Sequence, residues 1–107
     1  MLKLTNQDIA SILTRAKNYI KRHGWAQEEY GYKASGPACM IGACNAVTAA
    51  KLLQSNSTLS EDTPETKEVR QFLKKEFKIT SVEAWNDRQT RKEVFNLIDR
   101  AVAKLTK

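Results

Sequence analysis

Residues 38–54 are the part of the sequence that most limits how this chain can fold. Every residue in the stretch is apolar or small except Asn45, Thr48, Lys51 and Gln54. Pro37 suits the first position of a helix, so we expect a helix from there to about Gln54. A helix that is apolar around most of its circumference has to be covered on most sides. We therefore place it at the centre of the domain, with neighbours packed closely against its small residues Gly42, Ala46, Ala49 and Ala50.

A helix is also predicted before the central one. Thr5 and Asp8 have the spacing of a capping box, and apolar residues then recur at helical intervals from Ile9 to Ile20. Gly24 supplies a left-handed stop after a basic last turn. Gly31 and the Gly36-Pro37 pair interrupt the residues that follow, and a short extended piece or a hairpin at 25–36 is expected there.

Two more helices are expected in the second half of the chain. Thr63 and Pro64 open the first, and its apolar face is Val69, Phe72, Leu73 and Phe77. Trp85-Asn86-Asp87 is interpreted as a turn. Thr90 and Glu93 then open the last helix, and its apolar face is Val94, Leu97, Ile98, Ala101, Val102 and Leu105. The pattern predicts one all-α or mostly α domain over residues 1–107, a compact four-helix domain.

The charge balance limits the classes of partner that we expect this protein to bind. The chain has 18 Lys and Arg against 12 Asp and Glu, a net charge of +6, with no block of five or six like charges. Such a surface attracts nucleic acid weakly and without specificity. No apolar run approaches the roughly 18 residues that a membrane span needs, and the N-terminus does not resemble a signal peptide. We expect a cytoplasmic protein with reduced cysteines and no membrane contact.

Two connections carry the side chains best suited to binding. The first holds Trp25, Gln27, Tyr30, Tyr32 and Lys33, and tyrosine gives a large contact area at a low entropic cost. The second is Trp85-Asn86-Asp87, for which two interpretations stand. Either Trp85 packs in the core while Asn86 or Asp87 caps the last helix, or the two polar groups orient a ligand. If the first and last helices run antiparallel, both connections lie at one end of the domain and form one composite site.

Cys39 is the candidate nucleophile of a catalytic interpretation. In the first turn of a helix, unpaired amide groups would stabilise its thiolate, and His23 would be the base. The opposing interpretation makes Cys39 and Cys44 buried small residues of an alanine-rich helix, and we favour it. Two cysteines and one histidine do not complete a structural zinc site, so no metal and no cofactor are expected.

Three short elements resemble a family of small uncharacterised bacterial and phage proteins, a domain of unknown function. They are Gly-Trp-x-Gln at 24–27, Cys-x-x-Gly-Ala at 39–43 and Trp-Asn-Asp at 85–87. The resemblance covers residues 12–103 and implies no established activity.

The leading functional prediction is a small non-catalytic module of phage or mobile-element type that binds a host or partner protein. One alternative is a protein that binds a small molecule or a nucleotide through the same two connections. The other is a hydrolase or transferase that depends on Cys39. The sequence contains no convincing catalytic set, and this favours the binding module.

Overall fold

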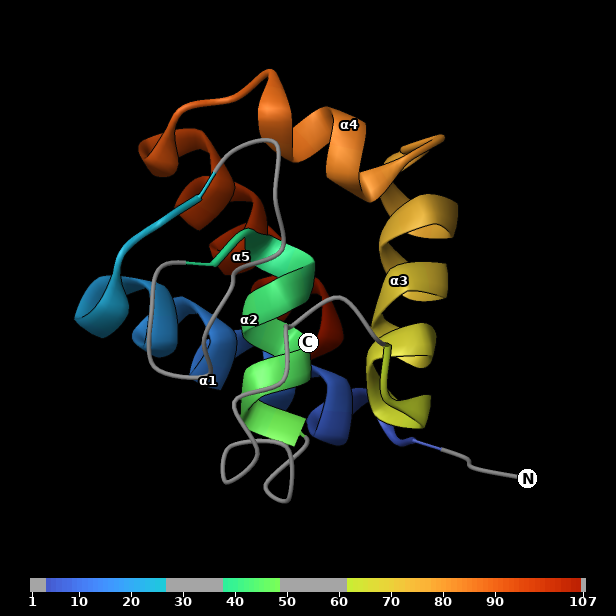
Figure 1. The fold of residues 1–107 in the computed structure, drawn as a ribbon. Helices are drawn as coiled ribbons and strands as arrows, with labels where there is room; N and C mark the ends of the chain where they lie inside the picture. The colour runs from blue at the N-terminus through green and yellow to red at the C-terminus, as the bar shows by residue number, and fades with distance from the viewer. Residues whose placement is uncertain (1–3, 27–37, 49–61, 107) are drawn as a thin grey trace.

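The structure is a computed structural model, and it describes residues 4–26, 38–48 and 62–106. Five helices occur in these residues (Figure 1): α1 (Asn6–His23), α2 (Met40–Thr48), α3 (Pro64–Phe77), α4 (Val82–Asp87) and α5 (Arg91–Leu105). The prediction of a compact, mostly α domain is confirmed. Predictions that concern Ala49, Ala50, Lys51 and Gln54 lie outside the described residues.

Both ends of α1 follow from the local sequence. The hydroxyl of Thr5 accepts from the backbone N–H of Asp8, and the Asp8 carboxylate accepts from the N–H of Thr5, so the predicted capping box is present. Gly24 ends the helix with φ 103° and ψ 162°. This backbone is a positive-φ conformation suited to glycine, but it is not the left-handed helical one expected. It turns the chain away from α1 toward the start of α2.

Helix α2 is the buried centre of the fold, as its apolar sequence predicts. Every residue from Met40 to Ala46 is buried, and α1, α3 and α4 all contact the helix. It begins at Met40 and not at Pro37, because Ala38 pairs with Trp25 instead of joining the helix. Cys39 takes the position before the first turn, where its carbonyl accepts from the N–H of Ala43 at 2.8 Å.

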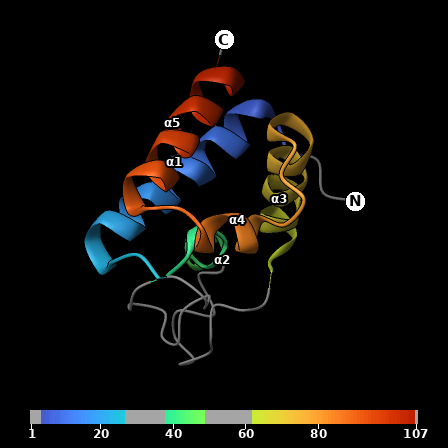
Figure 2. The ribbon, with the colours of Figure 1, turned by 90° about the horizontal axis from the view of Figure 1, so that it is seen from above.

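Helices α1 and α5 lie side by side and run antiparallel (Figure 2). The pairing of Lys17 with Asp99, whose Nζ and Oδ1 atoms are 2.6 Å apart, joins the second half of α1 to the middle of α5. Because of this direction, the end of α1 and the start of α5 lie at the same end of the domain. The buried face of α5 is the predicted one, except that Val102 is only half-buried.

The chain between α3 and α5 contains a short helix where a turn is predicted. Ser81 caps α4 by accepting from the N–H of Ala84 at 3.2 Å, and Val82 and Asn86 are buried one turn apart on the same face. The predicted N-caps of α3 and α5 are both present, since Thr63 accepts from the N–H of Thr66 and Thr90 from that of Glu93. Within the described part of the chain, no helix is long and apolar enough to cross a membrane.

Candidate functional site

Two backbone hydrogen bonds join the chain after α1 to the chain before α2. The N–H of Ala26 donates to the carbonyl of Ala38 at 3.0 Å, and the N–H of Ala38 donates to the carbonyl of Gly24 at 3.1 Å. They form a single parallel bridge between Trp25 and Ala38. We call the four residues Gly24, Trp25, Ala26 and Ala38 the clamp. The expected hairpin at 25–36 lies largely outside the described residues. At its described end, the paired segments are parallel, and a hairpin would make them antiparallel.

The side chain of Asn86 connects α4 to the clamp and to α2. Its Oδ1 accepts from the indole Nε1–H of Trp25 at 2.9 Å and from the backbone N–H of Met40 at 3.2 Å. Its Nδ2 donates to the carbonyl of Ala26 at 3.1 Å and to Oδ1 of Asp87 at 3.3 Å. The amide is buried, and these four contacts use its full hydrogen-bonding capacity.

These bonds bear on the two interpretations of Trp85-Asn86-Asp87 through the surroundings of Asn86. The amide of Asn86 has all its hydrogen-bonding positions occupied within the protein, so a ligand that bound it would have to displace an existing hydrogen bond in a buried setting. Asn86 caps a helix, as one interpretation has it, but the helix is α2 and not the last one. Thr90 already caps α5, so the prediction that Asn86 or Asp87 caps the last helix is wrong.

The other candidate binding residues divide between described and undescribed parts of the chain. Trp25 and Asp87 are half-buried and lie next to Asn86 at the same end of the domain. Trp85 is half-buried against the core. The candidates that lie outside the described residues are Gln27, Tyr30, Tyr32 and Lys33. The structure therefore brings together the described members of the predicted composite site, Trp25, Asn86 and Asp87.

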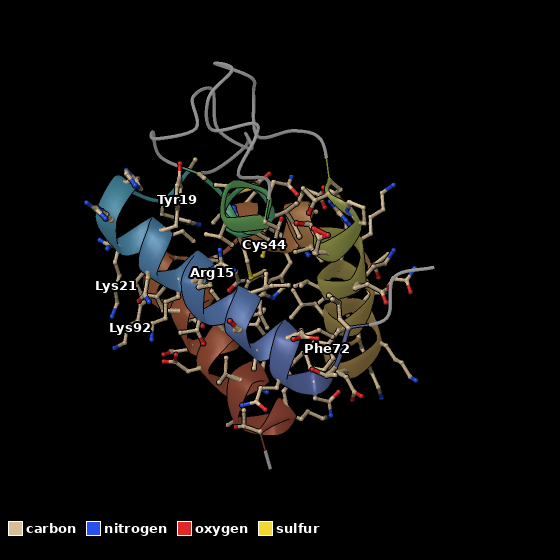
Figure 3. All side chains as sticks on the ribbon, turned by 90° about the horizontal axis from the view of Figure 1, so that it is seen from below. Arg15, Tyr19, Lys21, Cys44, Phe72 and Lys92 are labelled. Atoms are coloured by element: carbon tan, nitrogen blue, oxygen red, sulfur yellow. The ribbon has the colours of Figure 1, made fainter. Side chains whose placement is uncertain are left out.

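Cys39 is buried and its sulfur is used as a helix cap. The Sγ atom accepts from the backbone N–H of Gly42 at 3.3 Å. Burial raises the pKa of the Cys39 thiol to about 11, although hydrogen bonds from the backbone of Gly42 and Ile41 act against the rise. Burial also raises the pKa of Cys44 to about 12, and its side chain points into the interior between the helices (Figure 3). A nucleophilic cysteine needs a lowered pKa, so neither thiol has the required environment.

The described contact of His23 is with Tyr19 and not with Cys39. Its ring is tilted at 41° to that of Tyr19, with the ring centroids 4.4 Å apart. No hydrogen bond joins His23 to Cys39, Asn86 or Asp87 among the described residues. In the same residues, no group of three His, Cys, Asp or Glu side chains is placed to hold a metal ion.

A polar network centred on Arg70 joins α2, α3 and α4, and the sequence alone does not indicate it. Arg70 of α3 donates from Nε to the carboxylate of Asp62 at 2.9 Å and pairs through Nη1 with Glu83 of α4. Both carboxylates raise the pKa of the guanidinium against the opposing effect of burial. Asn45, one of the few polar residues of α2, donates to Asp62 at 3.3 Å. The residues of this network come from separate segments of the chain, so no spacing in the sequence predicts the network.

The chain is thus a small helical domain in which a short buried helix is tied at its start to a clamp between two distant segments. It belongs to the family of unknown function DUF6197, which it matches over residues 4–104. A search of the curated proteins and a search of the solved structures each found no match. The family description carries no activity, so a function has to be argued from the residues themselves.

Proposed function

We propose that this protein is a small non-catalytic binding module, and that residues 27–37 carry its contacts to a partner protein. The observation that carries the proposal is the clamp. Because Ala26 and Ala38 hydrogen-bond each other, both ends of the segment that holds Gln27, Tyr30, Tyr32 and Lys33 are fixed to one point of the core. Contact residues attached to a rigid scaffold lose less entropy on binding than residues on a free chain.

Asn86 and Asp87 have different parts in this proposal. Asn86 positions the segment, because it bonds to Trp25 and Ala26 on one side and to α2 on the other. Asp87 lies beside it and is half-buried, so its carboxylate flanks the base of the segment. Trp25 contributes part of its ring to the same surface while its N–H stays bonded to Asn86.

The environment of the two cysteines supports binding over catalysis. Both thiols are free and buried, and burial holds their pKa values far above neutral pH. Free thiols also support a reducing compartment such as the cytoplasm. The resemblance of the three short elements to bacterial and phage proteins favours an origin in a phage or mobile element, where a host protein would be the partner.

A photo-crosslinking experiment tests the proposal. A photoreactive phenylalanine analogue replaces Tyr30 or Tyr32 in one set of proteins, and Phe72 of α3 in a matched control. Each protein is irradiated in a lysate of the cells that carry the gene. We expect a discrete protein adduct from positions 30 and 32, none from position 72, and loss of the adduct when Lys33→Ala is added.

Two results would overturn the proposal. Adducts of equal yield from positions 30, 32 and 72 would show that the segment is not the contact surface. Co-purification of one metabolite with the protein, without any protein adduct, would instead favour the alternative of a small-molecule or nucleotide site. Asn86→Asp keeps the shape of the side chain but removes two donated hydrogen bonds. Added to the photoreactive proteins, it should weaken adduct formation, because Asn86 positions the segment.

A further inference from the structure

Three cationic side chains converge on one aromatic ring on the outer side of the α1–α5 pair. The ammonium groups of Lys17 and Lys21 lie 5.6 and 6.0 Å from the centroid of the Phe95 ring, and the guanidinium of Arg91 lies 5.1 Å from it. Lys21 and Arg91 are exposed, whereas Lys17 and Phe95 are half-buried. We call these four residues the Phe95 cluster.

The positive charge of this cluster is mostly uncompensated. Asp99 pairs with Lys17, and in the described part of the chain no carboxylate pairs with Lys21 or Arg91. Lys17 and Lys21 also stand one turn apart on α1, a spacing at which like charges repel. Lys92 projects at the same edge of the α1–α5 pair as Lys21 (Figure 3). An anion bound here would relieve this repulsion.

We infer that the Phe95 cluster binds a segment of single-stranded nucleic acid, with phosphates held by Lys21 and Arg91 and a base packed against Phe95. Proteins that bind single strands combine a positive surface for the backbone with an aromatic ring for the bases. This inference is independent of the proposed function, since it uses neither the clamp nor any residue of the segment 27–37.

The composition of the cluster favours a single strand over two other polyanions. In a duplex the faces of the bases are stacked and inaccessible, so Phe95 would add nothing to the binding of the phosphates. The centres of protein interfaces are depleted in lysine, whereas two of the three cations here are lysines. The net charge of +6 also attracts a polyphosphate at long range.

Binding of a labelled oligothymidylate of about 12 nucleotides tests the inference. Fluorescence anisotropy would follow the dissociation constant as the salt concentration is raised. For two phosphate contacts to a single strand, the slope of the logarithm of the association constant against the logarithm of the salt concentration should be about −1.4. The variant Lys21→Gln/Arg91→Gln should weaken binding at least tenfold and flatten this slope. The control Lys74→Gln/Lys75→Gln removes the same charge from α3, where both lysines are exposed, and should leave the slope unchanged.

The variant Phe95→Leu tests whether the cluster recognises the bases of a single strand or only the negative charge of any polyanion. It keeps an apolar side chain against the core and removes the aromatic face, so it should weaken oligothymidylate binding several-fold and leave the slope intact. Equal losses from the α3 control, or tighter binding to a duplex of the same length, would overturn the inference. So would competition by a polyglutamate peptide as effective as that by the oligonucleotide, because it would point to an acidic protein instead.

Discussion

Asn86 and Arg15 hold opposite ends of the same buried helix. Asn86 accepts from the N–H of Met40 at the start of α2, and Nη2 of Arg15 donates to the carbonyl of Val47 in its last turn at 2.5 Å. The first N–H and last C=O groups of any helix lack partners within it. Side chains from α4 and α1 supply a partner at each end: the bond from Met40 to Asn86 is buried, and the bond from Arg15 to Val47 is exposed to solvent.

Asn86→Ala should destabilise the fold strongly. The change leaves the indole N–H of Trp25, the carbonyl of Ala26 and the N–H of Met40 without their partner, and each buried polar group left unpaired costs about 1–3 kcal/mol. We expect the free energy of unfolding, measured by urea denaturation, to fall by at least about 2 kcal/mol. Asn96→Ala on the exposed face of α5 is the control, with an expected change within about 0.5 kcal/mol. Equal effects would mean that the Asn86 bonds contribute little.

Ala46→Leu tests the central position of α2. Ala46 is buried, and α1, α3 and α4 surround its helix, so the larger side chain has no room without displacing them. A loss of about 1–3 kcal/mol is expected from such overpacking. The same change at the exposed Ala103 of α5 should be nearly neutral. An unchanged denaturation midpoint for Ala46→Leu would place α2 at the periphery.

Alkylation of Cys39 should be slow in the native protein. Its sulfur is buried, and its pKa of about 11 leaves very little thiolate at neutral pH. Iodoacetamide labelling followed by mass spectrometry should show little reaction until urea unfolds the chain. A fast native reaction would restore the catalytic interpretation of this residue.

The buried thiols also predict how stability depends on pH. In the unfolded chain a cysteine has a pKa of about 8.5, and in the fold those of Cys39 and Cys44 are raised to about 11 and about 12. The folded state therefore keeps protons that the unfolded state loses. Stability from this source is complete below about pH 8.5 and declines as the pH rises toward about 11, by about 1.4 kcal/mol per pH unit for each thiol. Urea denaturation between these values should show a smaller decline in Cys39→Ala/Cys44→Ala.

Arg70→Met should destabilise the protein more than loss of a surface ion pair. The change leaves the carboxylates of Asp62 and Glu83 close together in a half-buried setting without their shared cation. We expect a loss of about 2 kcal/mol or more, because two partly buried carboxylates lose the charge that compensates them. Lys104→Met breaks the more exposed pair with Glu76 and should cost less than about 1 kcal/mol. Similar losses from the two variants would contradict a special position for Arg70.

The sequence predicts the helices well because their signals are local. Thr5, Thr63 and Thr90 each cap the helix that follows within three residues, and the apolar spacing of α1 and α5 marks the faces that pack together. The late start of α2 could not be predicted this way. It depends on the pairing of Ala38 with Trp25, which are brought together only by the finished fold.

The same distinction applies to the candidate site. Val82 and Asn86 are one helical turn apart, and this spacing predicts that Asn86 shares the buried face of Val82. The prediction holds only if the segment is a helix, and the sequence is interpreted as a turn. Apart from the neighbouring Asp87, the partners of Asn86 lie 46 to 61 residues away. No periodicity carries that information. For the Phe95 cluster, the i, i+4 pairs Lys17–Lys21 and Arg91–Phe95 are visible in the sequence, yet their convergence depends on the antiparallel packing of α1 and α5.

The two backbone hydrogen bonds between Ala26, Ala38 and Gly24 make this position a natural place for grafting. The energetic cost of closing a connection grows slowly with its length, by about 0.6 kcal/mol for each doubling. Foreign peptides inserted between residues 27 and 37 would begin and end at the same fixed point, so the helices need not adjust to their length. Inserts of different length and sequence at this place would leave the rest of the domain unchanged.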